Sequence, residues 1–238
     1  MKKILIVRTG GTFPEYREKH KDFEHWTAEG MGLSDAMWHC VNVQAGETLP
    51  EPEEFAGAAV TGSHDMVTDD ADWIRHAGDW VARAVDAGLP LLGICFGHQL
   101  MADALGGRAG YHPDGVEMGT ADVVLTEEGR KDVLLSGLPP VFKGHVTHSQ
   151  TALELPPGAV LLATGSHDPH QCFRVGRHAW GVQFHPEFDA AAIRYYLDRR
   201  EDILREAGRD VAAIRAAVCD TPESASLLER FAVYCRDR

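Results

Sequence analysis

The 238-residue sequence has no apolar run as long as a membrane-spanning helix, which needs about 20 residues. It is also short of basic residues, because 23 Lys and Arg stand against 36 Asp and Glu, a formal net charge of −13. Nucleic acids and anionic membrane surfaces both attract basic patches, so neither is expected as a partner. The start, Met-Lys-Lys-Ile-Leu-Ile-Val, predicts a core strand rather than a signal peptide because Arg8 interrupts its apolar run. We therefore expect a cytoplasmic protein.

Cysteine is scarce as well, and the five cysteines have no paired spacing; they are Cys40, Cys95, Cys172, Cys219 and Cys235. This pattern predicts neither a disulfide framework nor a zinc site. Two groups have the composition of metal ligands, His145 with His148, and His167 with Asp168 and His170, but no further acid or thiol partners them at ligand spacing. The Gly10-Gly11 pair lacks the Lys and Ser/Thr of a phosphate-binding loop. We expect no metal and no cofactor.

Short apolar runs alternate with helical patterns in the first half of the chain. Strands are expected over 3–7, 38–43, 56–60 and 89–94, and helices over 69–87 and 98–105. Residues 13–33 are polar, aromatic and irregular, and predict a surface loop with one helical turn at most. This order predicts a parallel sheet covered by helices, with the site at the carboxyl ends of its strands.

The pattern changes after Gly107. Short β-like runs over 123–125, 141–147, 160–163, 172–175 and 179–184 predict antiparallel ribbons added to the sheet. Helices are expected over 190–204, 211–218 and 226–235. We expect one main domain over 1–190 and a C-terminal helical extension over 191–238 that packs on it, as an appendage or a lid.

Cys95 stands where the strand over 89–94 meets the helix over 98–105, with Gly93 before it and Gly97 after it. A strand that turns directly into a helix needs small residues around the bend, and it leaves the residue at the bend strained and exposed. The helix that follows points its free N–H groups toward this residue, which favours thiolate over thiol. The pattern is that of a nucleophile elbow; a buried packing cysteine is the alternative.

A thiol nucleophile needs a base, and the base needs a group that orients it. His185 ends an alternating strand in Gly-Val-Gln-Phe-His-Pro-Glu (181–187), and Pro186 fixes the chain so that Glu187 turns back toward the imidazole. Alone, His-Pro-Glu equally fits the capped start of a helix.

Together, Gly-Ile-Cys-Phe-Gly-His-Gln (93–99) and the later His-Pro-Glu resemble the class I (triad) glutamine amidotransferases, over residues 3 to 190. The similarity extends to the glutaminase domain of GMP synthase and to γ-glutamyl peptidases. It implies an α/β three-layer sandwich with a mostly parallel central sheet, flavodoxin-like, plus C-terminal helices. It also implies that Cys95 attacks the side-chain amide of glutamine and forms a γ-glutamyl thioester, with His185 as base and then acid and Glu187 as its orienting partner.

The resemblance implies further site residues. The N–H of Phe96 and an N–H at Gly62 or Ser63 would form the oxyanion hole. Gln99 matches a glutamine that helps to hold the substrate. The segment Thr147, His148 and Ser149 falls where the family binds the substrate's α-amino and carboxylate groups, largely through backbone.

Three functions remain open from the sequence. The first is a glutaminase-type hydrolase that acts on glutamine, with a separate ammonia-accepting synthetase as partner, since the chain contains no P-loop and no Ser-Gly-Gly-x-Asp nucleotide loop. The second is a γ-glutamyl peptidase that acts on γ-glutamyl peptides or conjugates. The third is a non-catalytic binding protein on an amidotransferase scaffold, against which the intact Cys95, His185 and Glu187 argue.

Overall fold

The computed structural model describes residues 2–69 and 71–237, so Asp70, inside the helix predicted over 69–87, lies outside the described residues. A nine-stranded sheet runs in the order β2-β1-β3-β4-β11-β10-β9-β6-β7. Its strands are β1 (Ile4–Arg8), β2 (Trp38–Asn42), β3 (Gly57–Val60), β4 (Leu91–Ile94), β6 (Glu117–Leu125), β7 (Val141–His148), β9 (Val160–Thr164), β10 (Cys172–Val175) and β11 (Ala179–Val182). The five strands from β2 to β11 pair in parallel, and the rest pair antiparallel. A separate ribbon pairs β5 (Arg108–Tyr111) with β8 (Gln150–Glu154).

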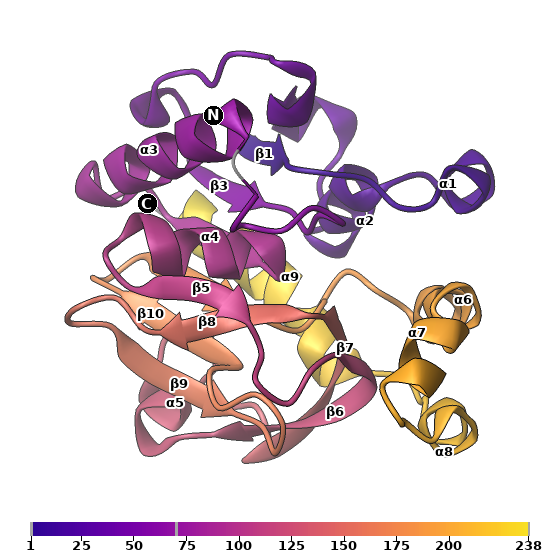
Figure 1. Cartoon of the computed structure of the whole chain (residues 1–238). Coiled ribbons are helices and arrows are strands. Elements are labelled where there is room, and N and C mark those ends of the chain that lie inside the picture. Colours follow the sequence, from indigo (N-terminus) through magenta and orange to yellow (C-terminus); the bar gives the residue numbers. More distant parts are fainter. Residues whose placement is uncertain (1, 70, 238) are drawn as a thin grey trace.

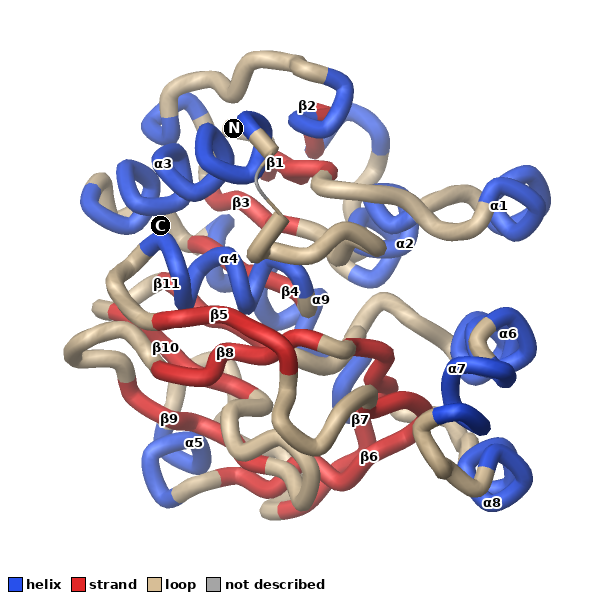
Figure 2. The backbone as a smooth tube through the Cα atoms, in the orientation of Figure 1, coloured by secondary structure: helices blue, strands red, loops and turns tan. Residues whose placement is uncertain are grey.

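The helices cover both faces of this sheet (Figures 1 and 2). They are α1 (Pro14–His20), α2 (Phe23–Gly30), α3 (Asp72–Asp86), α4 (Phe96–Ala104), α5 (Glu127–Lys131), α6 (Ala190–Arg199), α7 (Glu201–Glu206), α8 (Val211–Ala216) and α9 (Pro222–Arg236). Helices α3 and α4 pack on one face, and α2 and α9 pack on the other. The architecture is the expected α/β sandwich with a largely parallel central sheet.

Alternation along the parallel strands builds the two cores. In β1, Leu5 belongs to the cluster under α3 and α4, whereas Ile4 belongs to the cluster under α9. Successive side chains of a strand point to opposite faces, so each strand contributes to both cores. All four residues of β3 and of β4 are buried, as expected for parallel strands covered on both sides.

Helix α9 is part of the core. Its side chains Leu227, Leu228 and Phe231 are fully buried in the cluster that also holds Leu92 and Ile94 of β4. Burial of each such side chain stabilises the fold by about 1.5–3 kcal/mol. Helices α6, α7 and α8 instead gather at one end of the molecule, beside β6 and β7 (Figure 1).

The prediction for residues 13–33 was wrong. This segment forms helices α1 and α2, with Asp22 accepting a hydrogen bond from the Phe23 amide at the start of α2. The helices are stabilised by distant packing, because the ring of Phe23 lies 5.9 Å from that of Phe188. The helical pattern over 190–204 also breaks into α6 and α7, at Arg200. The β5–β8 ribbon was not predicted.

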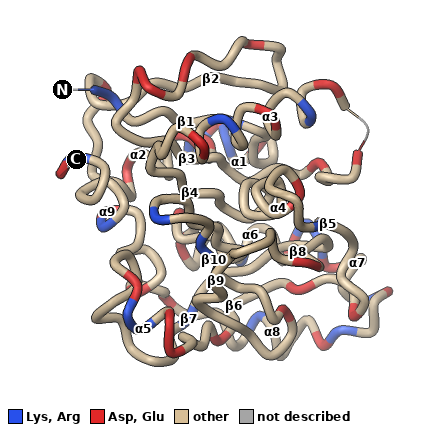
Figure 3. The backbone as a smooth tube through the Cα atoms, turned by 90° about the vertical axis from the view of Figure 1, so that its left-hand side faces the viewer, with Lys and Arg blue, Asp and Glu red and all other residues tan. Residues whose placement is uncertain are grey.

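Charged residues of both signs are mixed along the backbone in the side view of Figure 3. Among the described residues, no helix is both long and apolar enough to cross a bilayer.

Candidate active site

Cys95 joins β4 to α4 in a strained conformation, with φ of 50° and ψ of −98°. A positive φ is unfavourable for a residue with a Cβ atom and costs on the order of 1–3 kcal/mol, which the surrounding packing must offset. The side chain is 5% exposed, and its Sγ lies 3.9 Å from the carbonyl oxygen of Thr147. Cys95 therefore has the backbone geometry of a nucleophile elbow.

The elbow depends on two glycines that allow close approach. A Cβ on Gly97 would lie 2.4 Å from the carbonyl oxygen of Val60, and one on Gly93 would lie 2.5 Å from that of Gly97. Neither position has room for a side chain. The two glycines let the first turn of α4 rest directly on β3 and β4, which aims the start of α4 at the carboxyl edge of the sheet.

His185 and Glu187 form a buried pair just beyond the end of β11. The Nδ1 atom of His185 lies 2.7 Å from Oε1 of Glu187. The backbone amide of His185 donates to the carbonyl oxygen of His145 at 2.7 Å, and the ring of Phe188 lies 4.2 Å from the imidazole. These contacts fix the position of the imidazole and leave its Nε2 for the thiol.

Gly62 lies between the nucleophile and the base. A Cβ on Gly62 would lie 3.0 Å from Cε1 of His185 and 3.9 Å from Cβ of Cys95. The carboxyl ends of β3, β4 and β11 thus bring together three segments that are distant in sequence, of which only those after β3 and β4 were placed there by the parallel-sheet argument. The antiparallel prediction for residues 179–184 was wrong in part, because β11 pairs antiparallel with β10 but parallel with β4, and His185 therefore lies at the same edge of the sheet as Cys95.

The electrostatics of His185 favour the protonated ring. Burial by itself lowers the pKa of His185, but the carboxylate of Glu187 and the thiolate of Cys95 outweigh it and raise the pKa to about 10. A protonated imidazole beside Cys95 and Glu187 is therefore favoured at neutral pH, and it can supply a proton to a leaving group.

Two backbone amides beside Cys95 and His185 have no backbone hydrogen-bond acceptor among the described residues. Phe96 is the first residue of α4, so its N–H has no partner within the helix. In the described part of the chain, neither the Phe96 amide nor the Gly62 amide donates to another backbone group. Ser63 lines the neighbouring pocket, and its Oγ accepts a hydrogen bond from the Asp65 amide.

Gln99 lies one turn into α4, and its side chain is tied to the fold. Its Nε2 donates to the carbonyl oxygen of Gln150 at 2.6 Å and to Oε1 of Gln183 at 3.0 Å. The amide group thus links α4 to the start of β8. Gln99 lines the pocket, but its two donated hydrogen bonds are already made within the protein.

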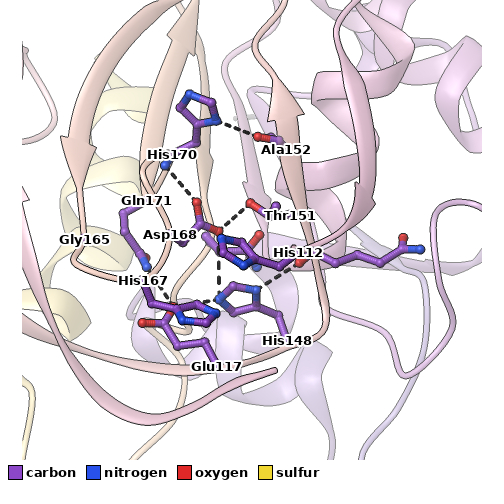
Figure 4. Close-up of polar contacts among 12 residues, drawn as sticks. His112, Glu117, His148, Thr151, Ala152, Gly165, His167, Asp168, His170 and Gln171 are labelled. Carbon is purple, nitrogen blue, oxygen red and sulfur yellow. Dashed lines mark hydrogen bonds and ion pairs between the residues drawn. The ribbon is translucent and has the colours of Figure 1, made fainter. Parts of the chain in front are cut away.

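Of the segment Thr147, His148 and Ser149, all three residues line the pocket. The imidazole of His148 is buried in a polar cluster with Glu117 and Asp168 (Figure 4). Its Nε2 lies 2.9 Å from Oε2 of Glu117, and its Nδ1 lies 2.9 Å from the carbonyl oxygen of Gln150. His148 therefore fixes the turn between β7 and β8 with its side chain and presents only backbone to a ligand.

Asp168 completes this cluster. Burial by itself raises the pKa of Asp168, but His148, the Thr151 hydroxyl and the His170 amide outweigh it and hold the pKa below its ordinary value. The His170 amide donates to Oδ1 at 2.8 Å, and Thr151 donates to Oδ2. In the described residues, no three His, Cys, Asp or Glu side chains are placed to hold a metal ion, so the cluster acts through hydrogen bonds and charge.

The pocket beside Cys95 has a second wall that the sequence did not reveal. Its lining includes Phe23 of α2, Phe188 after β11, Tyr196 of α6, and Arg200, Ile203 and Leu204 at the start of α7. Phe23 is distant in sequence from the other five residues, and Phe188 precedes α6, so local spacing could not reveal the whole wall. His64 and Asp65, which follow Gly62, also line the pocket.

Comparison with known proteins agrees with this geometry. Residues 35–197, more than half of the chain, match the family model "Glutamine amidotransferase class-I". A glutamine-hydrolysing GMP synthase subunit from Natronomonas pharaonis is 31% identical over 188 residues, which are 79% of this chain and 89% of that protein. The chain belongs to the class I glutamine amidotransferase family.

Other relatives differ in size and name. A GMP synthase of Aeropyrum pernix is 35% identical over 185 residues, which are 77% of this chain but only 32% of that enzyme. "Gamma-glutamyl peptidase 3" of Arabidopsis thaliana is 28% identical over 177 residues, which are 71% of this chain and 70% of that protein. The crystal structure of a glutamine amidotransferase from Thermotoga maritima superposes over the whole of both chains with a TM-score of 0.78 at 18% identity, which shows the same fold.

Proposed function

We propose that this protein hydrolyses the γ-amide bond of glutamine or of a related γ-glutamyl compound through a Cys95–His185–Glu187 triad. The observation that carries the proposal is the position of Gly62, because a Cβ added there would lie within contact distance of both the strained Cys95 and the paired imidazole of His185. Membership of the amidotransferase family supports the same reaction.

In the first half of the reaction, the thiolate of Cys95 attacks the γ-carbonyl carbon. The oxyanion that forms receives hydrogen bonds from the amides of Phe96 and of Gly62 or Ser63; loss of one such donor typically costs about 100-fold or more in rate. His185 then gives its proton to the nitrogen, the C–N bond breaks, and ammonia or an amine leaves. A γ-glutamyl thioester remains on Cys95.

In the second half, His185 takes a proton from water, and the resulting hydroxide attacks the thioester. The C–S bond breaks, glutamate is released, and the thiolate is restored beside the imidazolium. Glu187 holds the imidazole in place and stabilises its charge in both halves. The backbone of Thr147, His148 and Ser149 holds the α-amino and carboxylate groups of the γ-glutamyl moiety.

The candidate functions differ in which amine is released from the γ-carbonyl carbon and in where it goes. An ammonia-releasing glutaminase would serve a separate synthetase, as the name of the Natronomonas protein suggests. A peptidase would release an amino acid or peptide, as the name of the Arabidopsis relative suggests. A non-catalytic binding protein would leave the strain at Cys95 without a use.

Trapping the thioester tests the proposal. The protein is mixed with glutamine and with γ-glutamyl peptides, quenched in acid, and digested for mass spectrometry. We expect a γ-glutamyl adduct on Cys95, and Cys95→Ser should abolish thioester formation and turnover while keeping the circular dichroism of the wild type. Turnover that survives Cys95→Ser would refute the assignment.

A further inference from the structure

In the proposed reaction, the γ-glutamyl group and the leaving group of the substrate lie at different ends of the pocket. The general acid must touch the leaving nitrogen, so the leaving group lies on the His185 side of the scissile bond. The ring of Phe188 lies against His185 with ring centroids 4.2 Å apart, and Tyr196 lies beside Phe188 with ring centroids 5.1 Å apart. The leaving group therefore points toward the wall made by α6 and α7, away from the β7–β8 turn.

Arg200 is a free cation in that wall. Its guanidinium carbon lies 5.7 Å from the centre of the Phe13 ring, and the residue lines the pocket. Among described residues, no carboxylate lies within ion-pair distance of Arg200, although eleven other arginines or lysines have such partners, namely Arg8, Arg17, Lys21, Arg75, Arg83, Arg108, Lys131, Lys143, Arg174, Arg205 and Arg215. An unpaired, half-buried arginine at a pocket is suited to bind a carboxylate.

The neighbouring His64 and Tyr196 add no second positive charge to this wall of the pocket. Burial, with Arg200 and His185 adding to it, lowers the pKa of His64 to about 4, so this imidazole is neutral. Its Nε2 lies 3.0 Å from the Tyr196 hydroxyl, which donates to Oγ1 of Thr12 at 3.0 Å. The Asp65 carboxylate, also in the lining, accepts a hydrogen bond from the Gln44 side chain.

The rest of the wall is apolar. Ile203 is 45% exposed, a high value for so large an apolar side chain, and it lines the pocket with Leu204 and Met118. Ammonia has neither apolar surface nor negative charge, so it would use none of these features. An amino acid or short peptide with an apolar side chain and a free carboxylate would use both.

We propose that Arg200 binds the carboxylate of the leaving group, so that the substrates are γ-glutamyl amino acids or short γ-glutamyl peptides with an apolar residue after the γ-linkage. This inference rests on the proposed thioester chemistry. The reaction balances as before: the γ-amide C–N bond breaks, His185 protonates the nitrogen, water supplies the hydroxide, and glutamate and the free amino acid or peptide are released.

The test compares substrates that differ only in the carboxylate. The values of kcat/KM are measured for γ-glutamyl-leucine, γ-glutamyl-leucyl-glycine and the isoamylamide of γ-glutamate, which is γ-glutamyl-leucine without its carboxylate. Because of a charge-assisted hydrogen bond, we expect the wild-type kcat/KM to be about 10- to 100-fold higher for at least one of the two substrates with a carboxylate than for the isoamylamide. In Arg200→Gln this ratio should fall to near one. Arg199→Gln is the matched control, because Arg199 also lies over Phe13, at 5.2 Å, but does not line the pocket; it should keep the wild-type ratio.

Three outcomes would overturn the inference. They are a wild type without preference for the carboxylate, a faster reaction with glutamine than with either acid, or an Arg200→Gln variant that slows all substrates equally and keeps the ratio. Each of these would still show a γ-glutamyl adduct on Cys95. Absence of that adduct with every substrate would instead refute the proposed function itself.

Discussion

Oε1 of Glu187 lies 2.7 Å from Nδ1 of His185, across the single intervening Pro186. The rest of the fold contributes little to this contact, because only a rigid proline separates the two residues and restricts the backbone between them. It assigns Nδ1–H as donor to the carboxylate and leaves Nε2 for Cys95.

The contact predicts an order of kinetic effects. Glu187→Gln keeps a hydrogen-bond acceptor but removes the charge, whereas His185→Ala removes the proton carrier altogether. We expect His185→Ala to lower kcat/KM more than Glu187→Gln does, both measured with one γ-glutamyl substrate. A larger loss of kcat/KM in Glu187→Gln than in His185→Ala would contradict the roles assigned to the two residues.

The raised pKa of His185 predicts how stability depends on pH. The folded protein holds this proton up to about pH 10, while an unfolded histidine loses it near 6.5, so the stabilisation is complete below 6.5 and is lost as the pH rises through 10. Between about pH 6.5 and pH 10, each unit should cost up to about 1.4 kcal/mol. Urea unfolding of wild type and His185→Gln measures this; equal slopes for both proteins would contradict it.

The sequence predicted the parts of the site that depend on local spacing. Gly93, Cys95 and Gly97 define a bend by themselves, and His185 with Glu187 forms a pair across one proline, so both stretches could be found without a structure. Alternating strands and helices likewise predicted that β3 and β4 lie side by side in a parallel sheet. The parallel pairing of β11 with β4, which brings His185 to Cys95, was not predicted, because the run over 179–184 was expected in an antiparallel ribbon.

What could not be predicted depends on contacts between distant segments. Glu117 meets His148 only because β6 and β7 pair in a register that sets these two residues opposite each other. Helix α2 is stabilised by packing of Phe23 on Phe188, and nothing near Arg200 in the sequence indicates that it faces a pocket.

Close packing at the elbow predicts that Gly97 tolerates no side chain. In Gly97→Ala the new Cβ would lie 2.4 Å from the Val60 carbonyl oxygen, so α4 must move away from β3. We expect a loss of about 1–3 kcal/mol in the free energy of unfolding, together with loss of turnover. Gly78→Ala in α3 is the control: its nearest contact, with Ala104, is 3.5 Å, and it should be neutral or stabilise by up to about 1 kcal/mol. Urea unfolding curves of the two variants decide, and equal stabilities would contradict the packing argument.

The buried cluster around His148 predicts a structural cost for Glu117→Gln. The side chain of His148 is 1% exposed and that of Glu117 is 11% exposed, so little solvent screens the pair. Removal of the charge should cost about 1–3 kcal/mol. In the surface pair of Arg108 and Glu154, both side chains are more than half exposed, and Glu154→Gln should cost less than about 1 kcal/mol. Thermal unfolding of the two variants measures the difference in stability loss. Similar losses would show that the buried pair of His148 and Glu117 stabilises the protein no more than the exposed pair does.

The strained backbone of Cys95 predicts an unusual order of stability for two inactive variants. Glycine normally destabilises a folded protein relative to alanine by about 0.5–1 kcal/mol, because it loses more conformational entropy. At Cys95, φ is +50°, a region that glycine enters without a Cβ penalty, so Cys95→Gly should be more stable than Cys95→Ala by about 1 kcal/mol. At Ala102, in the middle of α4, the ordinary order should hold, and Ala102→Gly should be less stable than wild type by about 1 kcal/mol or more. Urea unfolding at one pH compares all three variants with wild type. If Cys95→Ala is as stable as Cys95→Gly, then the backbone at the bend carries no strain, and the positive φ of Cys95 costs nothing in the folded state.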